Sequence, residues 1–91
     1  MTEPLRTTVR VENHNFSDVD LFVVRSGGRI RLGTVTGLTT EVFTIPQGVV
    51  EVSGDLQFLA SPVGGRGGAL SMSIPASPGD SLVLEIPSGP L

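Results

Sequence analysis

The chain of 91 residues contains no cysteine, no tryptophan and no tyrosine, and all six of its basic residues are arginine. Without cysteine, a disulfide framework, a thiolate metal site and a cysteine nucleophile are all excluded. Without lysine, Schiff-base chemistry and the lysine of phosphate-binding P-loops are excluded as well. A single small domain of this length must therefore be stabilised by its hydrophobic core alone.

Positive charge is also scarce, because the formal net charge is −3. Nucleic-acid binding needs a basic surface that neutralises phosphates, so we expect no nucleic-acid partner. No apolar run approaches the roughly 20 residues of a transmembrane helix. The start of the chain, residues 1–4, lacks the charged and apolar regions of a signal peptide. We expect a cytoplasmic protein, or one of the cell envelope or exterior if a leader was removed.

The apolar residues that are present alternate with polar ones in short runs, a pattern typical of half-buried strands. The runs predict seven strands, at residues 7–12, 19–26, 29–36, 39–45, 55–60, 69–74 and 81–86. Residues 49–52 would form either a further short strand or an irregular connection. No stretch of the chain has a helical period.

Seven short strands with turn signals about every 8–12 residues favour an all-β fold, an antiparallel β-sandwich of immunoglobulin-like or fibronectin-like type. A small closed β-barrel is the alternative. We expect one domain over residues 1–91, with an ordered core at about residues 6–87. Since lysine is absent, protection of the sheet edges falls to Arg10, Glu12, Glu85 and the prolines that end strands.

Two adjacent glycines, Gly27 and Gly28, predict a two-residue hairpin turn between the second and third strands. In this register Phe22 lies opposite Gly33, so its ring would cover bare backbone. The predicted core face carries Val19, Leu21, Val23, Ile30 and Leu32. The predicted outer face carries Phe22, Val24, Arg29, Arg31 and Val35. Apolar side chains flanked by arginines favour a contact surface, whereas a covering sheet or loop would make them ordinary core.

One arginine is framed by four glycines in the segment Gly64, Gly65, Arg66, Gly67 and Gly68. Backbone amides of such a loop can cradle an anion, with the arginine as a clamp. Phosphate-binding loops normally lead into a helix, however, and this one leads into a predicted strand. A flexible hairpin loop is therefore the alternative interpretation.

His14 is the only histidine, and its nearest carboxylates downstream are Asp18 and Asp20. Their spacing matches no named metal motif, so we expect an ordinary loop histidine. The same aspartates, with Asp55 or Asp80, offer too few clustered oxygens for calcium. A serine nucleophile would have only His14 as its base, and no Gly-x-Ser-x-Gly elbow exists. We therefore expect no catalytic residue, no metal, no cofactor and no enzyme activity.

Residues 11–46 contain four short motifs: an Asn-rich turn at 13–15, an Asp-Val strand start at 18–19, Gly-Arg-x-Arg-Leu-Gly at 28–33 and Phe-x-x-Pro at 43–46. The later segments Leu-Ala-Ser-Pro at 59–62 and Ser-Pro-Gly-Asp at 77–80 fit the same layout. Over about residues 9–86 the chain resembles a group of small uncharacterised bacterial β-sandwich proteins, often predicted to be exported or lipid-anchored. The resemblance implies the fold and brings no established activity or catalytic residue.

These features predict a non-enzymatic interaction or structural module. It would associate with itself as a homo-oligomer, or dock to a protein partner, through the 19–36 hairpin face or a sheet edge. The alternative is a small-ligand or anion-binding domain that uses the arginine of the glycine-rich loop 64–68 or those of the hairpin.

Overall fold

The computed structural model describes residues 6–25, 28–46, 49, 54–64 and 68–89. These residues form seven strands: β1 (Thr8–Asn13), β2 (Val19–Arg25), β3 (Gly28–Val35), β4 (Thr40–Thr44), β5 (Gly54–Pro62), β6 (Leu70–Ala76) and β7 (Ser81–Ile86). All seven lie within two residues of the predicted bounds. The described part of the chain has no helix long and apolar enough to cross a membrane. Val49 lies in a turn, and residues 50–53 are outside the described part.

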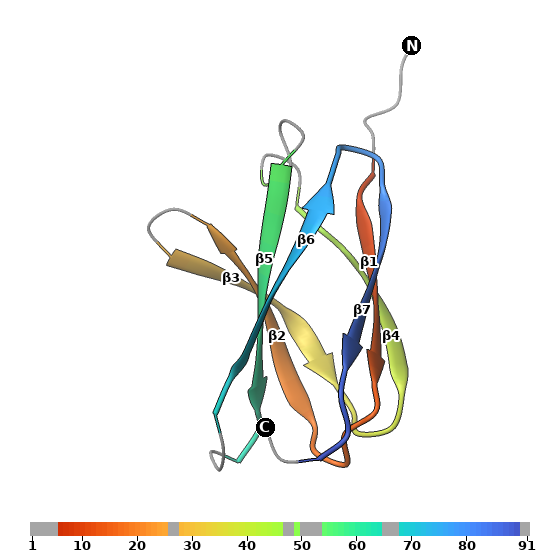
Figure 1. The fold of residues 1–91 in the computed structure, drawn as a ribbon, viewed down its shortest axis with the longest axis vertical. Coiled ribbons are helices and arrows are strands. Elements are labelled where there is room, and N and C mark those ends of the chain that lie inside the picture. The colour runs from red at the N-terminus through yellow and green to blue at the C-terminus, as the bar shows by residue number, and fades with distance from the viewer. Residues whose placement is uncertain (1–5, 26–27, 47–48, 50–53, 65–67, 90–91) are drawn as a thin grey trace.

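The strands form two sheets, which face each other as the two layers of a sandwich (Figure 1). The four-stranded sheet, in the order β3-β2-β5-β6, lies on the left in Figure 1, and the three-stranded sheet, in the order β4-β1-β7, lies on the right. The sheets do not close into a barrel. The prediction of an all-β sandwich is therefore confirmed.

Strand pairing is antiparallel except between β1 and β7, which run parallel in register from Thr8 opposite Ser81 to Asn13 opposite Ile86. In a constant-type immunoglobulin domain the first, second, fifth and fourth strands share a sheet. Here the first strand pairs instead with the fourth and the seventh. The strand order thus gives no support to the immunoglobulin-like part of the prediction.

The core lies between the two sheets and is built from alternate residues of each strand. Its fully enclosed side chains come from five strands: Val9, Val11, Val19, Leu21, Val23, Val35, Phe58, Ala60 and Ile86. The half-buried side chains of Leu70, Met72 and Ile74 on β6 pack against this cluster. Burial of each large aliphatic or aromatic side chain stabilises the fold by about 1.5–3 kcal/mol.

The β2–β3 hairpin contains a β-bulge that the sequence pattern does not reveal. Leu21 pairs with Gly33 but Phe22 pairs with Arg31, so Leu32 is the extra residue on β3. The prediction that Phe22 lies opposite Gly33 is therefore wrong. The predicted turn is also displaced, because Arg25 already pairs with Gly28 and the connecting residues 26–27 lie outside the described part.

The same bulge moves Val35 from the outer face to the core. Beyond the extra residue, Val35 pairs with Val19, and both side chains are fully buried. An inserted residue shifts the alternation of sides by one position. The prediction that Val35 belongs to the outer contact face is therefore wrong.

The space over Gly33 is filled by Phe43 of β4, a residue of the other sheet. A Cβ atom at position 33 would lie 2.6 Å from Cε1 of the Phe43 ring. This close approach joins β3 to β4 and closes that side of the sandwich.

The edge strands are β4 and β7 in one sheet and β3 and β6 in the other. Arg10 and Glu12 lie on β1, in the middle of its sheet, so the prediction that they protect an edge is wrong. Glu85 does lie on an edge strand, β7, and Pro75 lies within another, β6. β1 is central because it pairs with β4 on one side and, through the unexpected parallel pairing, with β7 on the other.

Candidate functional site

The outer side of the four-stranded sheet carries the predicted contact residues apart from Val35. Phe22 and Val24 are half-buried there, and they lie opposite Arg31 and Arg29 across the hairpin. On the other side of β2, Phe22 pairs with half-buried Leu59 of β5. We call these five residues the contact face. No described residue of the other sheet covers it, because that sheet packs on the opposite side.

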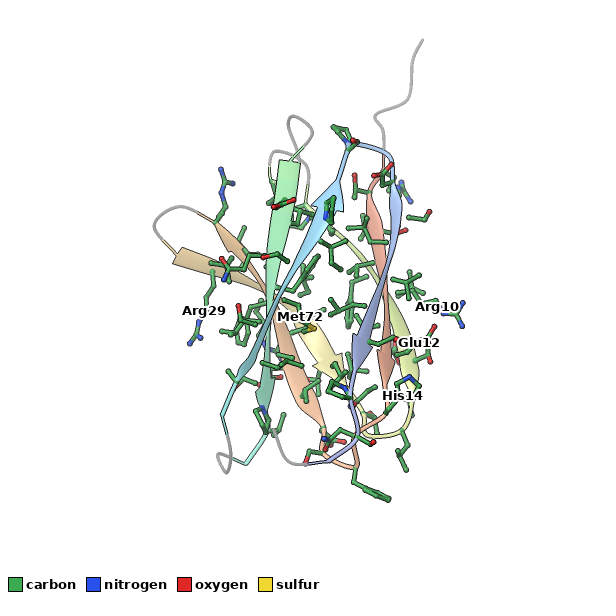
Figure 2. All side chains as sticks on the ribbon, in the orientation of Figure 1. Arg10, Glu12, His14, Arg29 and Met72 are labelled. Atoms are coloured by element: carbon green, nitrogen blue, oxygen red, sulfur yellow. The ribbon has the colours of Figure 1, made fainter. Side chains whose placement is uncertain are left out.

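The guanidinium of Arg29 lies over the ring of Phe22, with 4.6 Å between the guanidinium carbon and the ring centroid. A cation–π contact at a partly exposed site contributes about 0.5–1 kcal/mol. Figure 2 shows Arg29 on the outer side of the sheet, away from the three-stranded layer. The contact orders an aromatic ring and an arginine together before any partner arrives, which lowers the entropic cost of binding.

Arg31 is held by a small polar network beside the contact face. Its guanidinium donates to Oδ1 of Asp20 at 2.9 Å and to the hydroxyl of Thr34 at 2.7 Å. That hydroxyl in turn donates to Asp20 at 2.6 Å. The hydrogen bonds from Thr34 and Arg31 hold the pKa of Asp20 below its ordinary value of 3.8, against a smaller opposing effect of burial. Two arginines and one aspartate leave this surface with one net positive charge.

The glycine-rich loop is described only at its ends. Gly64 and Gly68 are exposed, while residues 65–67, including the predicted anion clamp Arg66, lie outside the described part. The anion-binding prediction for this loop therefore stays a prediction.

The four aspartates considered for calcium form no metal-binding cluster within the described ranges. Asp18 accepts a hydrogen bond from the amide of Gly37 at 2.8 Å, and Asp80 accepts one from the amide of Ser77 at 2.8 Å. Both bonds stabilise turns, which agrees with the interpretation of these carboxylates as turn residues.

His14 lies beside two glutamates rather than beside Asp18 or Asp20. Its Nε2 atom is 3.7 Å from Oε1 of Glu12 and 3.9 Å from Oε1 of Glu85. Sequence analysis missed this cluster. The spacing of Glu12 and His14 on one face of a strand is a visible signal, but Glu85 joins them only through the parallel β1–β7 pair.

The turn after β1 depends on two buried asparagines, Asn13 and Asn15. The sequence predicts only that they lie in a turn. The amide of Asn13 donates to the carbonyls of Ser17, Val35 and Thr36 at 2.9, 3.3 and 3.3 Å. The side-chain oxygen Oδ1 of Asn13 accepts a hydrogen bond from the backbone N–H of Asn15 at 2.9 Å. These hydrogen bonds order the Asn-rich turn and join the end of β1 to the end of β3.

This turn and the neighbouring turn at Gly37 and Leu38, between β3 and β4, carry two exposed apolar side chains. Phe16 is 86% exposed, and Leu38 is 58% exposed with a left-handed backbone, φ = 61°. The amide of Leu38 bonds the carbonyl of Asn15 at 2.9 Å. A Cβ atom at Gly37 would lie 2.1 Å from the carbonyl oxygen of Phe16, so only glycine fits there.

Comparisons of the chain with models of protein families, with curated proteins and with solved structures found no match. The resemblance to the bacterial β-sandwich group therefore stays a prediction.

Proposed function

We propose that this protein is a non-enzymatic interaction module that associates with further copies of itself through the contact face. The observation that carries the proposal is the half-buried ring of Phe22, held under Arg29 on a sheet face that no described residue of the other sheet covers. Aromatic and arginine side chains dominate the binding energy of many protein interfaces.

A second copy of the chain offers a complementary surface on its other sheet. There the exposed side chains of Val42 and Val83 flank Arg10 in one row across β4, β1 and β7. Glu12 and Glu85 form the next row. We call these two valines and two glutamates the acidic face. With His14 neutral, it has one net negative charge after Arg10 is counted.

The two faces lie on opposite sides of the sandwich, as the positions of Arg29 and Glu12 show in Figure 2. A positive apolar face on one copy and a negative apolar face on another favour each other by charge and by burial. Contacts between two different faces are heterologous, so they produce rings or open chains rather than isolated symmetric dimers.

The test uses two variants that each damage one face. Phe22→Glu places a carboxylate opposite the glutamates of a neighbour, and Val42→Arg places an arginine opposite its arginines. Each variant alone should be a monomer by light scattering. Their mixture should form a one-to-one dimer, because the first retains an intact acidic face and the second an intact contact face.

Val63→Glu is the control for an added carboxylate, because Val63 is 53% exposed and belongs to neither face. Its mass should equal that of the parent protein. An unchanged mass for Phe22→Glu would reject the contact face as the interface. A mixture that stays monomeric would reject the pairing of the two faces.

A further inference from the structure

We infer that Glu12, His14 and Glu85 form a binding site for a divalent transition-metal ion, with Zn²⁺ as the best fit. The site lies on the outer side of the three-stranded sheet. It does not depend on the self-association proposed above, because the three side chains belong to one copy of the chain.

The three ligand atoms already lie close together. Nε2 of His14 is 3.7 and 3.9 Å from the two glutamate oxygens, and all three atoms lie within 4.8 Å of one another. Bonds of 2.0–2.2 Å in a tetrahedral zinc site separate the ligand atoms by roughly 3.3–3.5 Å. Small rotations of these half-buried or exposed side chains are therefore enough to enclose an ion.

The backbone fixes all three positions before any ion binds. Glu12 and Glu85 are direct partners in the parallel β1–β7 register, and their side chains share one face. The amide of His14 continues this ladder with a bond of 2.9 Å to the carbonyl of Ile86. The backbone N–H of the next residue, Asn15, donates to the side-chain oxygen Oδ1 of Asn13, so the histidine lies at the start of a hydrogen-bonded turn. Figure 2 shows Glu12 and His14 next to each other on this side of the sheet.

The charges at the site favour a cation. Two carboxylates directly opposite each other on paired strands repel, so this arrangement is costly without a compensating positive charge. Arg10 contacts only Oε2 of Glu12, at 3.5 Å, which leaves Oε1 directed at His14. Glu85 contacts no arginine within the described residues. One imidazole and two carboxylates also suit zinc better than calcium or magnesium, which prefer oxygen ligands alone.

Three protein ligands leave one position of a tetrahedral ion open to water. The structure therefore assigns an exposed, exchangeable zinc site rather than a closed structural one. The fold does not need the ion, since the hydrophobic core is complete without it.

The experiment is a titration with ZnCl₂ of the Phe22→Glu variant, which keeps the acidic face free of any neighbour. Because His14 is the only histidine, the ¹⁵N resonances of its imidazole report binding without ambiguity. We expect a shift of Nε2 at one equivalent of zinc and a dissociation constant below about 1 mM. MgCl₂ at the same concentration should leave the resonance unchanged.

His14→Gln and Glu85→Gln should each weaken zinc binding, measured by calorimetry, about tenfold or more. Glu41→Gln is the charge-matched control, because it removes an exposed carboxylate of the same sheet outside the cluster. Equal losses in Glu41→Gln and Glu85→Gln would reduce the effect to general attraction by acidic charge and overturn the site. An imidazole that does not respond to zinc would overturn it as well. The circular dichroism spectrum of each variant should match that of the parent protein, which checks that the variant is folded.

Discussion

At the scale of single residues, the buried asparagines carry more of the structure than their place in a turn suggests. Asn13 is 2% exposed, and its side chain bonds four backbone groups, two in the turn at residues 15–17 and two at Val35 and Thr36. Composition alone marks Asn13 and Asn15 as turn formers. Asn13 bonds the end of β3, whereas the side-chain amide of Asn15 donates to the carbonyls of Pro87 and Gly89, and both contacts are non-local.

Replacement of Asn13 by alanine should lower the free energy of unfolding by about 1–3 kcal/mol, because three carbonyls lose a donor in a buried place. Chemical denaturation measures the change. Gln57→Ala is the control, since Gln57 is exposed and makes one hydrogen bond, to Ser71. The control should stay within about 0.5 kcal/mol of the parent. Equal losses in both variants would contradict the structural role of Asn13.

The network at Asp20 makes part of the stability depend on pH. Its pKa is lower in the folded chain than the ordinary value of 3.8, because Thr34 and Arg31 donate to the ionised carboxylate. This stabilisation is fully present when the pH is above the pKa of Asp20 in the unfolded chain. It is lost as the pH falls through the lower pKa of Asp20 in the folded chain. Unfolding curves between pH 7 and pH 2 should show a smaller acid loss for Asp20→Asn than for the parent. Identical curves would show that the network contributes nothing.

At the scale of elements, alternation of apolar and polar residues predicted all seven strands because most of them have one buried face. The bulge at Leu32 was missed because Arg29–Val35 alternates acceptably in either register. Its consequence reaches across the sandwich, since it turns Gly33 toward Phe43 and Val35 into the core.

Gly33→Ala should destabilise the protein by about 1–3 kcal/mol, because the added methyl group meets the Phe43 ring. Gly28→Ala on the same strand is the control, since nothing lies within 4 Å of its Cβ position. Thermal denaturation should separate the two variants. In the background of Phe43→Leu, the cost of Gly33→Ala should shrink, which identifies the ring as the cause. A cost that is the same in both backgrounds would contradict this packing.

At the scale of the whole molecule, turn spacing predicted two layers of strands but not their order. The parallel β1–β7 pair joins residues 8–13 to residues 81–86. No local sequence pattern predicts a contact between segments so far apart in the sequence. For the same reason, four members of the contact face were predicted from a hairpin, while the cluster of Glu12, His14 and Glu85 was not.

The central claim is that copies of this chain associate through opposite faces of the sandwich. The most direct measurement is the absolute mass of the parent protein by size-exclusion chromatography with light scattering, at two protein concentrations and two salt concentrations. If copies associate in this way, the mass exceeds that of one 9.5 kDa chain and rises with protein concentration. A single-chain mass under every condition would contradict it.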